Sequence, residues 1–497
     1  MAASLVGLLA GARPDHPAII VPDGPTLTYA ELGLEVDLLA ETLATAGIQR
    51  PDRIAMALPN GAEAVVALLA ASLVGVAAPL NQALAEDEFR FFLRDVEAKA
   101  LIVAPDGADR ARRARPSDTL VVEYGLAGGG RRRLRGAVPF GAPRTPAAPD
   151  TSDAALVLHS SGTTGRPKRV ALRNAQLLAS IGEIVRGYRL GPDDVALTVM
   201  PLFHVHGIVA GALATLAAGG TIVIPAHFNG LGFCKLVREH RVTWYSAVPT
   251  IHQLVLARAR SDASQCASLR FVRSASAKLP ATVRDGLAAT FGVPVIEAYG
   301  MTEAAHQIAS NPLEPDRCRP GTVGLATGVR IATMDDRGRL LPAGAEGEIV
   351  LKGPNVITHY DGNSEADAAS FSDGWFRTGD IGVLDRDGYV TLVGRLKEQI
   401  NRGGEKIAPA EIDEVLLSHP AVAEAVCFGV PHPSWGEEIE AAVVLRGGAT
   451  PEELIRHCRA HVAAFKVPKR IHLVDAIPRT ASGKIQRIAV ARELRAA

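Results

Sequence analysis

The chain has 497 residues, of which 47% are hydrophobic and 21% charged, and its 53 basic residues balance 53 acidic ones. This composition is typical of an ordinary globular protein and excludes global disorder. A chain with no net charge lacks the surplus of basic residues that nucleic acid or an anionic membrane surface would require, so neither partner is expected. The length corresponds to roughly three folding units of about 150 residues each.

The cysteines and the apolar runs indicate the compartment in which the protein works. The five cysteines lie far apart and include no C-x-x-C pair, so neither a disulfide framework nor a zinc site is expected, and a reducing compartment fits. The first apolar run has no basic residue before it, which argues against a secretory signal. No run reaches the roughly 18 to 20 apolar residues of a membrane-spanning helix. We therefore expect a cytoplasmic protein without a membrane span.

Helical and strand patterns alternate at the start of the chain. The first helical pattern has a capping box formed by Thr28 and Glu31. Apolar runs at 53–58 and 99–104 flank the helical pattern AEAVVALLAASLVGV, and this order is typical of parallel-sheet units. The segment 105–150 is rich in Arg, Gly and Pro, and we interpret it as a solvated surface excursion rather than a phosphate-binding patch.

The character of the pattern changes twice further along the chain. Apolar runs alternate with helical patterns between residues 153 and 300, whereas short strands with glycine turns follow residue 340 and predict antiparallel β structure. A polar segment comes after Arg395, and strands and helices then alternate to the end. The sequence therefore predicts an α/β fold: a large N-terminal body of α/β sheets with a small β subdomain (1–395), and a small, mobile α+β C-terminal domain (396–497).

The strongest local signal is LVLHSSGTTGRPKRVAL (156–172), an apolar strand that leads into a Ser/Gly/Thr loop and then into a second apolar run. Glycines allow successive backbone N–H groups to point at one anion, hydroxyls add donors, and Lys168 supplies positive charge. The segment is not a Walker A loop, because Gly162 and Gly165 are only three residues apart and Lys168 follows a proline. Its place between two apolar strands favours a polyphosphate cradle over a flexible linker.

Five motifs in order resemble those of the AMP-forming acyl-CoA synthetase superfamily, which also holds luciferases and carrier-loading adenylation domains. They are SSGTTGRPK (160–168), EAYGMTEA (297–304), RTGD (377–380), GRLKEQINRGGEKIAPAEID (394–413) and PRTASGKIQR (478–487). Over its C-terminal two thirds the sequence looks most like the oxalate–CoA ligase branch. The resemblance implies ATP, Mg²⁺ and coenzyme A. Family members convert a carboxylate to an acyl-adenylate with release of pyrophosphate, and a thiol then displaces AMP.

The resemblance implies a phosphate site built from two of these motifs. Thr163, Thr164 and Lys168 would hold the β- and γ-phosphates. Thr302 would contact the α-phosphate, and Glu303 would act both as a catalytic residue and as the Mg²⁺ ligand. A glutamate is a suitable hard oxygen ligand for that ion.

The nucleoside would be bound by residues of three motifs, EAYGMTEA, RTGD and GRLKEQINRGGEKIAPAEID. By resemblance, Tyr299 would stack on adenine, while Asp380 would accept hydrogen bonds from the ribose diol and Arg395 would donate to it. The full set of residues expected to bind ATP is Ser160, Ser161, Gly162, Thr163, Thr164, Gly165, Lys168, Tyr299, Gly300, Thr302, Asp380 and Arg395.

The resemblance also implies a catalytic lysine and a domain movement. Lys484, in a loop of the C-terminal domain, would bridge the substrate carboxylate and the α-phosphate, and a compact ammonium on a long stem suits that reach. The same site must then open for a thiol, and Lys397 matches the family's hinge position. Gly403, Gly404 and Glu405 would face the active site in the second conformation and leave room for a pantetheine arm, with an ordinary β-turn as the alternative.

The segment PLFHVHG (201–207) resembles the one that carries the family's acyl-site histidine, which would make His204 a catalytic residue. His206, Ser276 and His306 fall where walls of the acyl pocket are expected by similarity. Imidazoles would be costly beside a fatty acid but are useful donors to a second carboxylate, which favours oxalate or another short polar acid. Histidines that are satisfied inside the core are the alternative.

Three positions depart from the family's usual pattern. Arg169 stands where a Gly commonly follows the loop lysine, Ala275 replaces a usual Gly, and Lys278 replaces a usual Pro. None of them removes a catalytic group, and Lys278 suggests the hypothesis that an acidic substrate is favoured.

Taken together, these observations predict an ATP-dependent, AMP-forming carboxylate–CoA ligase. Its partners would be a small-molecule carboxylic acid, ATP and CoA, and a homodimer is an open expectation. Three alternatives are a CoA ligase for a medium- or long-chain or aromatic acid, an adenylation enzyme that loads a carrier protein, and a nucleotide-binding sensor without turnover.

Overall fold

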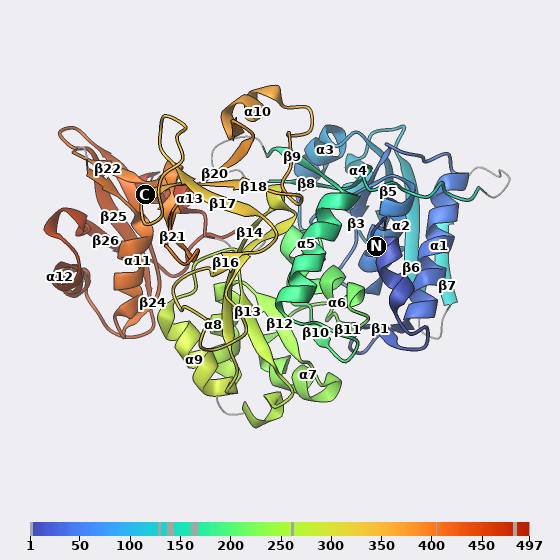
Figure 1. The fold of residues 1–497 in the computed structure, drawn as a ribbon, viewed down its shortest axis with the longest axis horizontal. Helices are drawn as coiled ribbons and strands as arrows, with labels where there is room; N and C mark the ends of the chain where they lie inside the picture. Colours follow the sequence, from blue (N-terminus) through green and yellow to red (C-terminus); the bar gives the residue numbers. More distant parts are fainter. Residues whose placement is uncertain are drawn as a thin grey trace.

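The computed structural model describes residues 3–127, 131–136, 144–160, 167–259, 263–403, 405–480 and 485–496. In these ranges the strands form four sheets, of seven, nine, five and five strands. Figure 1 shows the first two sheets with their helices on one side of the molecule and the C-terminal segment on the other, with the β subdomain near the middle. The predicted mixed α/β architecture is confirmed.

The seven-stranded sheet has the order β7-β6-β5-β3-β4-β8-β9, with parallel pairing at its centre and antiparallel strands at both edges. The strands are β3 (Arg53–Ala57), β4 (Val76–Pro79), β5 (Ala98–Val103), β6 (Leu120–Ala127), β7 (Arg131–Gly136), β8 (Ala154–His159) and β9 (Arg169–Arg173). The antiparallel turn from β8 to β9 carries the Ser/Gly/Thr loop.

Helix α1 (Tyr29–Thr45) begins at the predicted capping box. The Thr28 hydroxyl accepts from the Glu31 backbone at 3.2 Å, and the Glu31 carboxylate accepts from the Thr28 backbone at 2.8 Å. Helix α2 (Ala62–Val74) is buried along almost all of its length and ends one residue before Gly75. The apolar run that predicted one helix therefore continues as strand β4, because such a run fits a helix and a buried strand equally well.

The interpretation of 105–150 as a surface excursion is wrong for its central part. Helix α4 (Asp109–Ala114) and strands β6 and β7 occupy it, and β6 pairs in parallel with β5. Two arginines of this segment pair with carboxylates, since Arg112 lies 2.7 Å from Glu123 and Arg113 lies 2.8 Å from Glu86. An edge strand accepts charged residues because one of its faces remains in water.

The nine-stranded sheet has the order β16-β15-β14-β13-β12-β10-β11-β1-β2. The strands are β1 (Pro17–Ile20), β2 (Thr26–Thr28), β10 (Val195–Leu197), β11 (Thr221–Val223), β12 (Trp244–Ala247), β13 (Phe271–Ser274), β14 (Val295–Met301), β15 (His306–Ser310) and β16 (Leu325–Ala326). Strands β10 to β14 are mutually parallel, and β14 turns back through β15. In open α/β sheets the carboxyl ends of parallel strands are where ligands bind.

Helices join the two large sheets. Helix α5 (Asn174–Gly187) contacts β9 of the first sheet and β15 of the second, and one continuous core spans both sheets. The remaining helices of this part are α3 (Glu86–Asp95), α6 (Ala214–Ala217), α7 (Phe233–His240), α8 (Pro249–Ala259), α9 (Ala281–Phe291) and a π-helix, η2 (His206–Leu213).

The chain after residue 340 forms the expected antiparallel β structure, in one sheet with a strand that precedes it. It consists of β17 (Arg330–Met334), β18 (Glu346–Lys352), β19 (Phe371–Ser372), β20 (Trp375–Leu384) and β21 (Val390–Arg395), with helix α10 (Ser364–Ser370) beside it. Strand β20 pairs with both β18 and β21, so the RTGD segment lies in the middle of this sheet.

After a short turn, η6 (Leu396–Glu398), the C-terminal segment builds a separate sheet with its own core. Its elements are β22 (Ile400–Arg402), β23 (Glu405–Ile407), α11 (Pro409–Ser418), β24 (Val422–His432), β25 (Gly436–Leu445), α12 (Pro451–His461), β26 (Arg470–Leu473) and α13 (Arg487–Ala496). A division into two domains at 395/396, and the mobility of the second domain, stay predictions. None of the described helices is long and apolar enough to span a membrane.

Candidate active site

The turn between β14 and β15 brings the YGMTE motif to the carboxyl end of the parallel strands. Gly300 permits this turn, because a Cβ there would lie only 2.0 Å from the carbonyl oxygen of His306. Thr302 and Glu303 follow in a short 3₁₀ turn (Thr302–Ala304). The backbone of this tight turn therefore fixes the positions from which the Tyr299 and Glu303 side chains extend.

Asp380 joins Tyr299 and Arg395, two of the residues predicted for the nucleoside. The Tyr299 hydroxyl donates to Oδ2 of Asp380 at 2.5 Å, and Nε of Arg395 lies 2.9 Å from Oδ1. Asp380 and Arg395 face each other in the β20–β21 pair, so the sheet register sets this contact. The Asp380 carboxylate raises the pKa of Arg395, and burial followed by the same carboxylate raises the pKa of Tyr299. A carboxylate has about four acceptor positions, so two remain for vicinal hydroxyls.

The base of the Ser/Gly/Thr loop is closed by backbone contacts. The Ser160 N–H donates to the Lys168 carbonyl at 2.8 Å, and the Lys168 N–H donates to the Ser160 hydroxyl at 3.4 Å. The predicted phosphate-binding residues between them lie outside the described residues: Ser161, Gly162, Thr163, Thr164 and Gly165. The two ends of the loop are held together by the pairing of β8 with β9.

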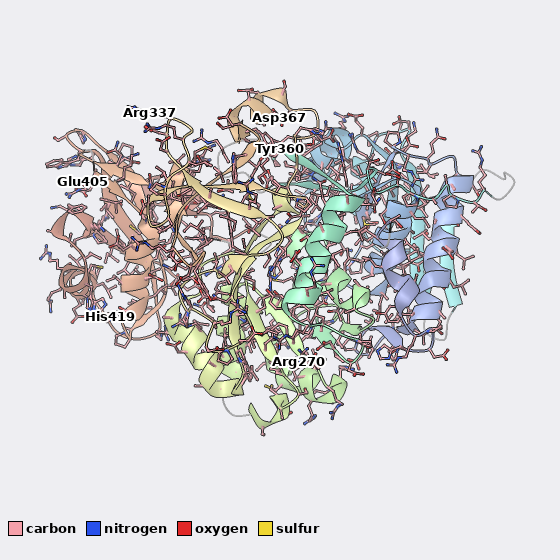
Figure 2. The ribbon with its side chains drawn as sticks, viewed as in Figure 1. Arg270, Arg337, Tyr360, Asp367, Glu405 and His419 are labelled. Atoms are coloured by element: carbon pink, nitrogen blue, oxygen red, sulfur yellow. The ribbon has the colours of Figure 1, made fainter. Side chains whose placement is uncertain are left out.

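Lys168 and Glu303 lie on either side of Tyr360. The Lys168 ammonium sits 4.4 Å from the centre of the Tyr360 ring, and the Tyr360 hydroxyl donates to Oε1 of Glu303 at 3.1 Å. Burial lowers the pKa of Lys168 and raises the pKa of Glu303. The Asp367 carboxylate opposes the effect of burial and raises the pKa of Lys168. Figure 2 shows Asp367 and Tyr360 in the same region of the molecule.

The residues present fit a magnesium ion that is held mainly by phosphates and water. The described ranges contain no group of three or more His, Cys, Asp or Glu side chains that could hold a metal. Mg²⁺ at nucleotide sites typically uses one or two carboxylates and keeps phosphate and water oxygens as its other ligands. The buried carboxylate of Glu303, in which the charge of the loop lysine Lys168 opposes the rise in pKa caused by burial, could serve as such a ligand.

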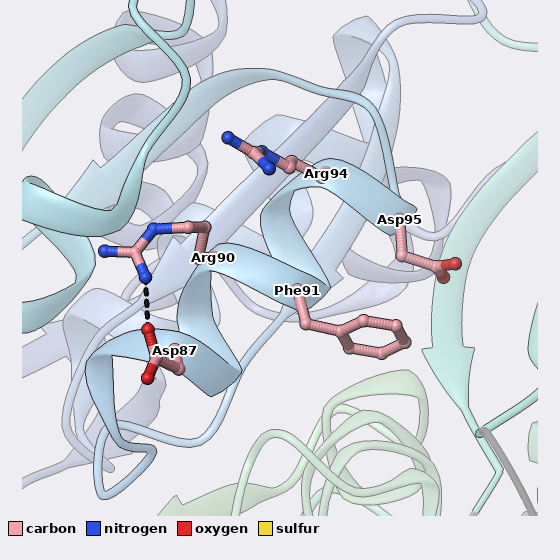
Figure 3. Close-up of a pocket in the computed structure, with 5 residues that line it drawn as sticks. All are labelled: Asp87, Arg90, Phe91, Arg94 and Asp95. Carbon is pink, nitrogen blue, oxygen red and sulfur yellow. Dashed lines mark hydrogen bonds and ion pairs between the residues drawn. The ribbon is translucent and has the colours of Figure 1, made fainter.

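Arg169, which departs from the family pattern, ties the loop base to its surroundings. Its Nε lies 3.4 Å from Oδ2 of Asp361, and its guanidinium also donates to the Asp95 carbonyl. Asp95 ends helix α3 and contacts Nε2 of His159 at 2.8 Å. Figure 3 shows Asp95 at the edge of a hollow on α3, away from the Asp87–Arg90 ion pair. Arg169 therefore holds the base of the Ser/Gly/Thr loop in place through its contacts with Asp361 and Asp95.

The three residues predicted for the acyl pocket are in mutual contact. The His206 ring stacks on His306 with centroids 4.9 Å apart, and Nδ1 of His206 lies 3.1 Å from the Ser276 hydroxyl. Both rings are buried, whereas Ser276 is exposed. Burial lowers the pKa of each histidine well below its ordinary value, with Arg273 as a further cause. The two imidazoles are therefore neutral at physiological pH.

His204 lies just before the π-helix that carries His206. Burial lowers the pKa of His204 to about 4, so this imidazole is also neutral near pH 7. A positive charge on His204 would lower the pKa of His206, which indicates that the two side chains lie close together. π-Helical turns are rare and often mark functional sites, which agrees with the expected place of His204 at the acyl end.

The residues predicted for the hinge and for CoA all lie at the start of the C-terminal segment, between residues 397 and 405. Lys397 is exposed, and its charge lowers the pKa of Lys168, so it lies near the phosphate loop. Glu405 lies far from Tyr360 on the outer side of the C-terminal sheet (Figure 2). Gly403 packs against Trp435, whose ring a Cβ would meet at 2.8 Å. Gly404 and the catalytic candidate Lys484 lie outside the described residues.

Lys278 points to the C-terminal segment in this structure. Its ammonium forms an ion pair with Oε1 of Glu414 on helix α11 at 2.9 Å, and both side chains are partly exposed. The contact joins the segment that contains Ser276 to the C-terminal sheet. The hypothesis that Lys278 selects an acidic substrate has no support in this geometry, because its charge is already matched.

Two site residues were missed by the sequence analysis. Arg273 lies at the centre of the histidine cluster, and Tyr360 lies between Lys168 and Glu303. Arg273 had a signal, since an arginine inside the apolar strand pattern FVRSASA is unusual for a buried strand. Tyr360 had none, because its segment matches no motif.

Comparisons with known proteins agree with this geometry. The model of the AMP-binding enzyme family matches residues 9–361, and that of the AMP-binding enzyme C-terminal domain matches residues 411–484. The chain is 43% identical to an oxalate–CoA ligase of Arabidopsis thaliana, over 98% of each chain. It is 37% identical to a sulfoacetate–CoA ligase of Cupriavidus necator, over 98% of this chain and 96% of the relative.

A solved structure shares the whole fold. ATP-bound MatB from Rhodopseudomonas palustris superposes with a TM-score of 0.90 at 32% identity, covering 100% of this chain and 99% of the other. The two family models together account for both large sheets and for most of the C-terminal sheet. The chain belongs to the AMP-binding enzyme family and is an AMP-forming acid–thiol ligase with ATP and CoA as substrates.

Proposed function

We propose that the protein is an oxalate–CoA ligase, or a CoA ligase for another very short acid that carries a second negative charge. The observation that carries the proposal is the polar cluster at the acyl end, in which His206 and His306 lie beside the buried guanidinium of Arg273 and Ser276 contacts His206. The relatives named for oxalate and for sulfoacetate both act on two-carbon acids with two anionic groups, which supports the same substrate class.

The polar cluster argues against the runner-up substrates. A medium- or long-chain or aromatic acid needs apolar walls, whereas the walls here would present imidazole and hydroxyl groups with which an apolar tail cannot form hydrogen bonds. A second carboxylate would instead accept hydrogen bonds from hydroxyl and imidazole donors.

The proposed reaction has two steps. In the first, a carboxylate oxygen of the acid attacks the α-phosphorus of ATP and pyrophosphate leaves. An anion approaches a polyanion in this step, so positive charge must be placed between them. Lys168 would hold the phosphate tail, Asp380 and Arg395 would hold the ribose, and Lys484 would bridge the two reacting groups. In the second step, the thiol of CoA attacks the acyl carbon and AMP leaves.

Mg²⁺, held by Glu303 together with phosphate and water oxygens, would offset phosphate charge when bound. Tyr360 orients the Glu303 carboxylate through its hydroxyl and faces Lys168 with its ring. The chain thus positions its metal ligand and its phosphate-binding lysine through one shared side chain. None of the five cysteines forms a disulfide, and we place the protein in the reducing cytoplasm.

The test is acid-dependent exchange of labelled pyrophosphate into ATP over a panel of acids from oxalate to palmitate, followed by detection of the thioester. We expect oxalate or another two-carbon dianion to give the highest kcat/KM, and CoA rather than a carrier protein to release AMP. A clear preference for longer acids would overturn the substrate assignment. An absence of exchange with every acid would favour a nucleotide sensor.

A further inference from the structure

Arg273 is a buried cation whose partners are all neutral. It lies on β13, is 0% exposed, and forms no ion pair with any carboxylate in the described parts of the chain. Its guanidinium donates to the Tyr188 hydroxyl at 2.8 Å, the Ser246 hydroxyl at 2.8 Å, Nε2 of His306 at 3.0 Å and Oε1 of Gln307 at 2.7 Å. Buried charges in proteins are normally paired, so we expect an anionic ligand to supply the counter-ion of Arg273.

The donors of Arg273 determine where the neighbouring protons sit. Arginine cannot accept a hydrogen bond, so Nε2 of His306 is the acceptor and its proton is on Nδ1. The Ser246 hydroxyl accepts from Arg273 and therefore donates its own hydrogen to Nε2 of His206, at 2.7 Å. His206 then carries its proton on Nδ1 and donates it to the Ser276 hydroxyl at 3.1 Å.

The end of this chain of hydrogen bonds is exposed. Because Ser276 accepts from His206, its own hydroxyl hydrogen is free to be donated to a ligand. Two residues of the cluster hold backbone angles that favour glycine, since φ is +73° at Ser276 and +89° at His306. Strain of this kind persists where function requires a particular side-chain position.

We propose that Arg273 is the positioning residue that makes this enzyme select doubly charged acids. Its unmatched positive charge attracts the distal anionic group of the acid. Through Ser246 and His206 it also orients the Ser276 hydroxyl as the donor to that group. The inference rests on the proposed function and specifies its basis, because a second carboxylate or sulfonate would be chosen by charge rather than by the shape of the pocket.

The first experiment compares matched acids in the full-length protein with Arg273→Met. Methionine retains much of the volume and removes the charge, and apolar replacements of buried ionic groups are often tolerated. For oxalate and sulfoacetate we expect kcat/KM to fall about 30- to 1000-fold, mainly through KM, which is the usual cost of removing a buried charged partner. For the single-charge analogues glyoxylate and propionate, and in the KM for ATP, we expect changes below about threefold.

Two further variants separate the charge from the hydrogen bonds. Ser246→Ala keeps Arg273 but breaks its connection to His206, so we expect an intermediate loss of about tenfold for the dianions. Arg270→Gln is the matched control, because Arg270 directly precedes the same strand and pairs with Asp194, which directly precedes β10. It should leave the ratio of dianion to monoanion rates unchanged.

The pH profile provides a readout that a purely structural role would not change. His206 faces His306, Arg273, His204 and His252, and the Arg273 charge lowers the pKa of both His206 and His306. Without that charge the two imidazoles take up protons more readily as pH falls. In Arg273→Met the preference for dianions should therefore recover in part at a higher pH than any such gain in wild type.

The outcomes of the two proposals are distinct. If wild type prefers dianions and Arg273→Met keeps that preference with an unchanged pH profile, Arg273 does not select the charge and the proposed function stands. If wild type itself prefers singly charged or long acids, the proposed function fails whatever Arg273 does. Should Arg273→Met not fold, Arg273→Gln and Ser246→Ala carry the same comparison, and full dianion preference in both would overturn the inference.

Discussion

Tyr360→Phe tests whether one hydroxyl controls the metal ligand of the active site. Tyr360 is only 4% exposed, its hydroxyl donates to Glu303 at 3.1 Å, and its ring faces Lys168 at 4.4 Å. Phenylalanine removes the hydrogen bond and keeps the ring. A hydrogen bond to a charged group contributes about 1.5–3 kcal/mol, and 1.4 kcal/mol corresponds to a factor of ten. We therefore expect the Mg²⁺ concentration for half-maximal exchange to rise about 10- to 100-fold.

The expected pH dependence has a definite sign. Burial already raises the pKa of Glu303, and the Tyr360 hydroxyl opposes that rise. Without the hydroxyl the pKa rises further, so the carboxylate takes up a proton at a higher pH and loses its affinity for Mg²⁺ there. The acid limb of Mg²⁺-dependent activity should move to higher pH in Tyr360→Phe, and the defect should be larger at pH 6 than at pH 8.

Tyr360→Leu separates the ring from the hydroxyl. It removes the contact with Lys168 as well, which is worth about 1 kcal/mol for a partly exposed ammonium, so the KM for ATP should rise about fivefold in addition. Tyr389→Phe is the matched control, since its hydroxyl donates to the Arg317 carbonyl at 2.5 Å and its ring faces Arg319 at 3.9 Å. Equal Mg²⁺ profiles for Tyr360→Phe and wild type at both pH values would refute this reasoning.

Three further changes test other parts of the site. Asp380→Asn should raise the KM for ATP about 10- to 100-fold, and it should lower Tm because Arg395 loses its partner. Steady-state exchange measures the first effect and thermal unfolding the second. An unchanged KM would contradict the role of Asp380 in binding the ribose. Lys278→Glu should alter the ratio of adenylation to thioester formation, and adding Glu414→Lys should restore it; the coupling should be about 0.2–1 kcal/mol because both side chains are partly exposed. Lys484→Ala should reduce pyrophosphate exchange at least about 100-fold while sparing thioester formation from added acyl-adenylate, and intact exchange would remove Lys484 from the first step.

Those features that depend on residues close together in the chain could be predicted from the sequence. The capping box of α1 needs only Thr28 and Glu31, three residues apart, and the structure forms it as expected. The alternation of strands and helices follows from periodicity, and it recovered the order of the central elements. The same reasoning included the start of β4 in the helical pattern of α2, because the apolar run continues across Gly75 without a change of period and without a charged residue.

Contacts that depend on strand pairing escaped the sequence analysis. Tyr360 reaches Glu303 across 57 positions of the chain, and Arg273 reaches His306 across 33. Nothing local indicates such a partner, because the distance between the side chains is set by the turn at Gly300 and by the order of strands in the sheet. The histidines themselves could be predicted by resemblance, but the source of positive charge beside them could not.

The distribution of charge along the site gives a physical reason for a small dianionic acid. At the nucleotide end each cation has an acidic neighbour, since Arg395 pairs with Asp380 and Lys168 feels the charge of Glu303. At the acyl end Arg273 has only neutral acceptors among the described residues. A fatty acid would leave that buried charge unmatched, whereas the second anionic group of oxalate would supply its counter-ion. The proposed selectivity for such an acid would therefore follow from where the fold leaves positive charge without a carboxylate partner among the described residues.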